Sequence, residues 1–309
     1  MTTGVKPAKK PLKTRIYTYR WFYLMILPVF IFALLFNYYP LLGIRFAFYN
    51  YTPFKGPDFC GFDNFSKLLA NAQFWTAFKN TWILSLGNLI FTTSAAVILS
   101  LLLNEIKNLK AKKFMQTLIY VPHFLSWVVV ASIFAIILSP QNGFFNEILV
   151  QLGIIDSPIY FMAESKAWRA VFFIINIWKE TGWGTVIYLA TLSGINPELY
   201  EAARMDGATR LQQMRYVTMP ALSNTIVIVV ILNLAKIMNI FESVLVLYSP
   251  KVYTVADVLQ TYVYRQTLTT QVPNFGYSTA VGLFRSLIGC ALVLICNQLS
   301  KKVRGRGII

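Results

Sequence analysis

One short charged segment of the sequence, Glu201–Gly207, lies between two long apolar stretches. It reads Glu-Ala-Ala-Arg-Met-Asp-Gly, and Val217–Pro220 follows after nine further residues. A charged helix-turn-helix on the face of an otherwise apolar protein is suited to contact with a partner protein. The sequence contains no Ser-His-Asp, Cys-His or paired-carboxylate arrangement, so we expect the chain not to be an enzyme.

Five charged residues lie inside the apolar stretches, where each costs about 2.5–3.5 kcal/mol on insertion scales and is a candidate for function. They are Lys179, Glu180, Lys236, Glu242 and Arg285. We expect all of them except Lys179 to line the path of a substrate.

Polar and aromatic residues accompany these charges at helical spacing. One set stands at i, i+4 and i+7 on a single helix face, and a second set stands three residues apart. The two sets are Asn176, Glu180 and Trp183, and Asn233, Lys236 and Asn239. These side chains suit a sugar, because amides and carboxylates bond hydroxyl groups while an indole stacks on the apolar face of a sugar ring.

Composition places most of the chain in a lipid bilayer. The chain has 309 residues, of which 56% are hydrophobic and 13% are charged, and its mean hydropathy is +0.56. The net charge of +16 would suggest nucleic acid in a soluble protein. In a membrane protein it indicates loops on the cytoplasmic side, and we expect no nucleic-acid partner.

Six stretches are long enough to cross the hydrocarbon core as helices, which takes about 20 residues each. They are 21–43, 80–103, 114–138, 168–193, 219–247 and 277–299. Pro28, Pro40 and Pro122 predict kinks or helix ends. Seventeen Lys and Arg residues fall in the two tails and in loops 104–113 and 194–218. The positive-inside rule therefore predicts that both termini are cytoplasmic.

The predicted organisation is a basic tail at 1–20, a membrane domain at 21–300 and a basic tail at 301–309. The remaining loops, 44–79, 139–167 and 248–276, are long and predicted to lie outside. The insert 194–218 has helix signals of its own. Asn196 and Pro197 predict a helix start, Gly207 predicts a turn with positive φ, and Thr209 predicts the cap of a second short helix.

The insert resembles the coupling loop of ABC-importer permeases, with Val217 and Met219 where Ile and Leu are usual. The resemblance implies an all-α integral membrane protein with six spans, of the type I importer class, and a cytoplasmic coupling helix between spans 4 and 5. It implies that a separate ATPase docks on this loop, and no Gly-x-x-x-x-Gly-Lys-Ser/Thr phosphate loop is present in the chain. The coupling residues it implies are Tyr200, Glu201, Ala202, Ala203, Asp206 and Gly207.

Further segments resemble the carbohydrate-uptake subclass of these permeases: Gly61–Phe65, Phe74-Trp75, Asn80-Thr81, and the run from Asn176 to Tyr200. The resemblance implies an oligosaccharide substrate and a bacterial cytoplasmic membrane. It implies as partners a second homologous permease, two ATPase subunits and an extracytoplasmic solute-binding protein that delivers sugar to the outer loops, especially 248–276. No cofactor is expected on this chain, because ATP is hydrolysed by the partner.

Several alternatives remain open at this point. Lys236 and Glu180 could pair only to hold two spans together, whereas Lys236 and Arg285 could bind the carboxylates of an acidic sugar. His123, the only histidine, is expected to pack or to donate one hydrogen bond. The rival functions are an ion-gradient-driven secondary transporter, which predicts inverted repeats that the sequence does not display, a membrane enzyme, and an ABC permease for a solute other than a sugar.

Overall fold

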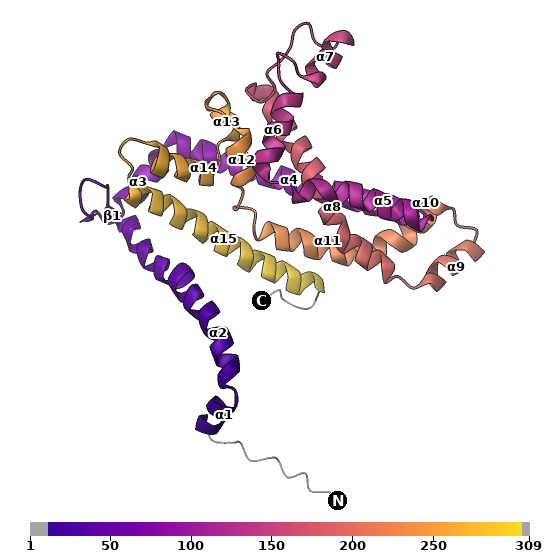
Figure 1. The fold of residues 1–309 in the computed structure, drawn as a ribbon, viewed down its shortest axis with the longest axis horizontal. Coiled ribbons are helices and arrows are strands. Elements are labelled where there is room, and N and C mark those ends of the chain that lie inside the picture. The colour runs from indigo at the N-terminus through magenta and orange to yellow at the C-terminus, as the bar shows by residue number, and fades with distance from the viewer. Residues whose placement is uncertain (1–11, 305–309) are drawn as a thin grey trace, which may run out of the picture.

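The computed structural model describes residues 12–304, which form a mainly helical protein with one short hairpin (Figure 1). The hairpin pairs β1 (Tyr49–Asn50) with β2 (Asp58–Phe59). The predicted tails lie partly outside the described residues, which include only 12–20 and 301–304 of them. The prediction of a helical protein with several apolar helices is confirmed.

Four helical runs in residues 12–304 are long and apolar enough to cross a membrane, and one bent pair brings the total to five. The four are Arg20–Phe48, Ala72–Glu105, Arg210–Leu234 and Phe275–Lys302. The predicted fourth span corresponds to α8 (Ser165–Ser193), a 29-residue helix. This helix is long enough to cross a membrane, but its composition is too polar for it to be counted among the four runs. Asn176, Lys179 and Glu180 lie in its middle.

The first of these runs is exposed over most of its length and contacts the rest of the chain mainly through its last part, 39–48, which packs against the run Phe275–Lys302. α1 (Leu12–Thr18) precedes it, and it continues from α2 (Arg20–Ala33) through η1 (Leu34–Tyr38) and η2 (Tyr39–Phe48). No residue of α2 is buried, and the helix leads away from the other helices (Figure 1). Its apolar side chains must therefore be covered by lipid or by another chain.

The second run, α4 (Ala72–Glu105), packs lengthwise against α8 and forms the centre of the fold. Two buried clusters join them. One surrounds Trp168 and Phe172 of α8, and the other joins Ala96 and Leu101 of α4 to Tyr188 of α8. The short α3 (Asp63–Ala70) precedes α4.

The predicted third span, 114–138, is not one straight helix. It is divided into α5 (Leu109–Tyr120), η3 (Val121–Phe124) and α6 (Trp127–Ile137), and the two arms meet at 101°. Pro122 lies at the break, as the sequence predicts, because proline lacks the N–H that would continue the hydrogen-bond ladder. Ser126 then caps α6 by accepting a hydrogen bond from the Val129 N–H at 3.3 Å.

The predicted bounds of the fifth span, 219 and 247, are both wrong. The helix begins earlier, because α10 (Arg210–Gln213), η4 (Met214–Thr218) and α11 (Met219–Leu234) form one run of 25 residues. The second short helix of the insert begins as predicted, with Thr209 Oγ1 accepting from the Gln212 N–H at 3.4 Å, but it continues into α11 instead of ending as a separate helix. After Leu234 the chain leaves helical geometry until α12 (Glu242–Leu247). Lys236 and Asn239 consequently lie in a break and share no helix face.

Segment 248–276, predicted as a long outer loop, is largely helical and packed into the protein. It holds η5 (Pro250–Val252), α13 (Tyr253–Ala256), α14 (Leu259–Tyr264) and η6 (Arg265–Thr269), before α15 (Phe275–Arg304). Asn80 of α4 donates to the Thr254 and Asp257 carbonyls at 3.1 Å each, and Arg169 of α8 donates to the Asn80 Oδ1 at 2.8 Å. By contrast, α7 (Phe144–Gln151) lies on a projecting hairpin (Figure 1).

A buried ion pair locks this segment. Asp257, whose side chain is 5% exposed, binds Arg265, and its Oδ1 accepts from the Thr261 hydroxyl at 2.7 Å. Burial raises the pKa of Asp257, and Arg265 and Thr261 partly oppose that increase. Breaking a buried pair leaves an unpaired charge, which is strongly destabilising.

We therefore predict that Arg265→Met destabilises the folded protein by about 3 kcal/mol at neutral pH, whereas Arg265→Lys loses less. Because Arg265 lowers the pKa of Asp257, its removal raises that pKa further. Protonation of Asp257 removes the unpaired charge, so the deficit of Arg265→Met shrinks as pH falls through the pKa of Asp257 in the variant. Thermal unfolding of the purified protein across pH measures this, and an equal deficit at all pH values would contradict it.

Candidate functional site

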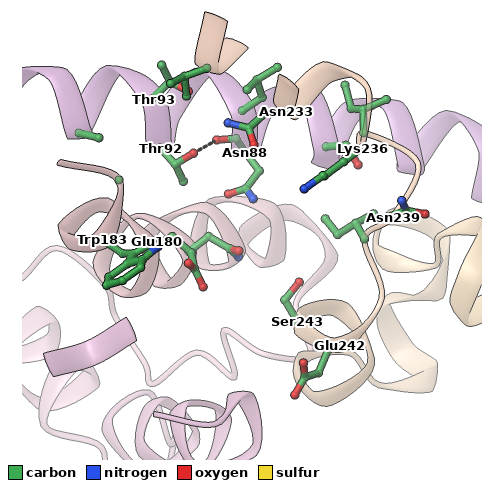
Figure 2. Close-up of a pocket in the computed structure, with 18 of the residues that line it drawn as sticks. Asn88, Thr92, Thr93, Glu180, Trp183, Asn233, Lys236, Asn239, Glu242 and Ser243 are labelled. Atoms are coloured by element: carbon green, nitrogen blue, oxygen red, sulfur yellow. Dashed lines mark hydrogen bonds between the residues drawn. The ribbon is translucent and has the colours of Figure 1, made fainter. Parts of the chain in front are cut away.

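The largest cavity near the charged residues has a volume of about 720 Å³ and lies between α4, α8 and the break after α11 (Figure 2). Seven of the eight residues predicted for the substrate path line it: Asn176, Glu180, Trp183, Asn233, Lys236, Asn239 and Glu242. Residues more than 60 positions apart in the sequence are thus brought to one space. Its volume falls within the roughly 300–1,000 Å³ of ordinary ligand pockets.

Arg285 is the predicted residue that does not line this cavity. It lies on α15 beside a smaller cavity of about 390 Å³, which Phe241 also lines. Its Nη1 donates to the Asn239 Oδ1 at 3.3 Å, and this bond connects it to the wall of the larger cavity. Arg285 is therefore linked to the cavity only through Asn239 in the described part of the chain.

The Glu180 carboxylate is held by two groups that the sequence analysis did not associate with it. His123 Nδ1 lies 2.9 Å from Oε2, and Lys179 Nζ lies 3.5 Å from Oε1. In the described part of the chain no ion pair joins Glu180 to Lys236, so the alternative in which that pair ties two spans together is wrong. Lys236 is exposed, and its amine is directed into the cavity (Figure 2).

Trp183 presents an aromatic surface to the cavity. Its side chain is 49% exposed, and one face of the indole stacks on the His123 ring with centroids 4.9 Å apart and planes 3° apart. Phe124 meets it edge-on at 6.0 Å. Asn176, by comparison, is buried, and its Nδ2 donates to the Phe172 carbonyl of its own helix at 2.7 Å.

The structure adds polar residues that sequence reasoning missed. Asn88, Thr92 and Thr93 of α4 face the cavity, and Thr92 Oγ1 donates to the Asn88 carbonyl at 2.6 Å (Figure 2). Within residues 12–304 the Asn88 Oδ1 is buried and has no hydrogen-bond partner. The signal in the sequence is an amide and two hydroxyls spaced by four and five residues in stretch 80–103, whose interior has no charged residue to mark it.

The insert 194–218 contains α9 (Pro197–Met205), with Asn196 Oδ1 accepting from the Glu198 N–H at 3.1 Å as its cap. Gly207 follows with φ +76°, a conformation that favours glycine, so the predicted start, end and turn are confirmed. Glu201, Ala202 and Asp206 are exposed, and Ala203 is half-buried.

Tyr200 is directed differently from these neighbours. Its hydroxyl bonds the Thr218 hydroxyl at 3.0 Å, which ties α9 to the helix that runs into the membrane. Arg210 adds an ion pair to Glu105 at the end of α4, at 3.1 Å. Tyr200 therefore contacts its own chain, while Glu201, Ala202 and Asp206 remain open to a partner.

Known proteins are similar to this chain over most of its length. The family described as "Binding-protein-dependent transport system inner membrane component" matches residues 96–305. The polygalacturonan/rhamnogalacturonan transport system permease protein YteP of Bacillus subtilis (strain 168) is 40% identical over 98% of this chain and 94% of that protein. Protein LplB of the same organism is 38% identical over 94% of this chain and 91% of that protein.

A solved structure with the same fold is similar over nearly the whole chain. It is a bacterial ABC transporter involved in the import of the acidic polysaccharide alginate. The matched chain is 35% identical with a TM-score of 0.86, covering 96% of this chain and 100% of that one. The chain described here belongs to the family of binding-protein-dependent transport system inner membrane components, the permeases of ABC importers.

Proposed function

We propose that the chain is the membrane-spanning subunit of an ATP-driven importer of oligosaccharides and that its cargo carries uronate groups. Family membership excludes both the secondary transporter and the membrane enzyme. The observation that carries the proposal is the cavity between α4, α8 and α11, where an exposed indole, an exposed ammonium and several amides converge.

The lining of this cavity suits a carbohydrate. Trp183 offers an indole face to the apolar side of a sugar ring, and Asn88, Asn233 and Thr92 offer groups that bond hydroxyls. A sugar is recognised by many moderate hydrogen bonds around one stacking surface. The lining of this cavity offers both kinds of contact. An ABC permease for a different solute is the alternative that the experiments below can identify.

Lys236 and the names of the relatives support an acidic cargo. Lys236 has no ion pair in the part of the chain that the structure describes, so its ammonium is available to a carboxylate. Glu180 is held by His123 and Lys179, which reduces its repulsion of such a group. The relatives above are named for polygalacturonan and alginate, which are both acidic polysaccharides.

The importer requires further subunits, which we propose as follows. A second, homologous permease completes the path and, with lipid, covers the uncovered helix α2. A solute-binding protein delivers the sugar, as in the solved alginate transporter complex with its pentasaccharide-bound periplasmic protein. Because segment 248–276 is largely packed, its exposed part at 268–272 and the hairpin bearing α7 are the surfaces left for docking.

We further propose that two separate ATPase subunits bind α9 and that this chain binds no cofactor. The exposed Glu201, Ala202 and Asp206 form the contact, and Tyr200 transmits motion of α9 to the continuous helix Arg210–Leu234. Both termini lie in the bacterial cytoplasm. The six spans follow when α8 and the bent pair α5–α6 each cross the membrane.

We predict that Gly207→Asp and Glu201→Lys each lower uptake and ATPase stimulation roughly 30-fold, because a central contact residue contributes about 2 kcal/mol or more. Uptake and ATP hydrolysis by the reconstituted complex measure this. Gly61→Asp is the matched control, since Gly61 also has positive φ (+57°) with nothing near its Cβ position. Retained coupling in the first two variants, with normal assembly, would overturn the role of α9.

We also predict that Lys236→Met lowers uptake of a galacturonate oligosaccharide by roughly ten- to hundredfold, because a charge-assisted hydrogen bond contributes roughly 1.5–3 kcal/mol. Uptake of a neutral oligosaccharide should change little. The control is Lys166→Met, which removes an exposed charge at the start of α8. Equal loss for both sugars would reject the uronate role of Lys236, and transport of neither by wild type would favour a different solute.

A further inference from the structure

One residue, His123, connects the break in the bent helix pair to the wall of the cavity through its contacts with Glu180 and Trp183. It lies in η3 beside Pro122, where the α5 ladder ends. His123 itself does not line the cavity, whereas Glu180 and Trp183, which both contact its ring, do. Its influence on a substrate must therefore pass through these two side chains.

Contacts with α8 fix the backbone at His123. Lys179 Nζ donates to the His123 carbonyl at 2.8 Å and lies 5.2 Å from the centroid of the Trp127 ring. The Lys179 side chain is only 5% exposed. At Gly182 the two helices approach so closely that a Cβ would lie 2.0 Å from the Ile119 carbonyl oxygen. The break is thus held against α8 by a buried cation and by close backbone contact.

The side chain of His123 is then fixed by two different interactions. Because an ionised carboxylate only accepts hydrogen bonds, Nδ1–H donates to Glu180 Oε2, at 2.9 Å. The ring meanwhile covers one face of the Trp183 indole in a parallel stack. Each interaction restricts a side chain that faces the cavity, so neither has to be ordered when a ligand arrives.

Simple packing does not require this combination. A packing histidine would serve equally with any apolar neighbour, whereas here one imidazole sets the position of both the carboxylate and the indole. Within residues 12–304 these are also the ring's only recorded polar and stacking partners, apart from an edge contact with Phe124.

We propose that His123 is a positioning residue for sugar transport, which presets Trp183 as a stacking surface and Glu180 as a hydrogen-bond acceptor in the transport cavity. The proposal rests on the proposed function for its transport readout. It makes the helix break part of substrate recognition as well as of the fold.

Two variants separate the interactions. His123→Asn keeps a donor two bonds from Cβ, where Nδ1 stands, and removes the stack. His123→Phe keeps a ring on Trp183 and removes the donor. We expect each to lower sugar transported per ATP hydrolysed by about three- to tenfold, because such contacts contribute about 0.5–1.5 kcal/mol. ATP hydrolysis stimulated by the loaded binding protein should change much less.

Double-mutant cycles in the reconstituted complex with a galacturonate oligosaccharide give the decisive readout. His123→Asn should add nothing in a Trp183→Leu background, and His123→Phe should add nothing in a Glu180→Leu background, where no acceptor remains. Ser126→Ala is the control, because it removes the cap of α6 at the same break without touching either partner. It should leave transport per ATP unchanged.

A second measurement does not depend on the cargo. Hydroxyl-radical labelling of Trp183, read by mass spectrometry, should rise in His123→Asn and stay at the wild-type level in His123→Phe. Additive effects in both cycles, or unchanged labelling in His123→Asn, would overturn the positioning role. Loss of wild-type sugar transport with the labelling pattern intact would instead overturn the proposed function and support the positioning of Trp183.

Discussion

A helix that breaks inside a membrane protein frees backbone groups, and these must find partners within the protein because hydrocarbon offers none. This constraint organises the centre of the fold. Pro122 ends the α5 ladder, and the buried ammonium of Lys179 binds the His123 carbonyl there. Once Lys179 is fixed, the adjacent Glu180 and Trp183 are directed toward His123 and the cavity. Lys179, which holds the helix break, and Glu180, which lines the cavity, are therefore neighbours on α8.

The second break, at 235–241, faces the same cavity. Irregular backbone at membrane depth is tolerated where it lines a polar space, and this segment carries Lys236 and Asn239. One wall is thus a helix face made rigid by ring stacking and by an ion pair, while the other is a non-helical turn. A cavity with walls of such different construction can change shape by movement of one side.

The two ends of the protein also differ in how firmly their helices are held. At one end, Asn80, Arg169 and the Asp257–Arg265 pair hold α13 and α14 in a buried polar network. At the other end, α9 is exposed and attached mainly through the Tyr200–Thr218 hydrogen bond. Because Arg210–Leu234 is one continuous helix, the movement of α9 that we propose would be transmitted along it toward Lys236.

Sequence alone determined the membrane class, the apolar stretches, the caps and turn of α9, and the charged residues that line the cavity. These follow from local chemistry: runs of apolar residues, costly charges within them, and residues with strong cap or turn preferences. Only the tertiary structure decided which charges meet. It paired Glu180 with His123 and Lys179, left Lys236 open, bent the third stretch by 101° and packed 248–276 into the core. Partners separated by more than 50 residues are chosen by packing, and the sequence contains no local signal for that choice.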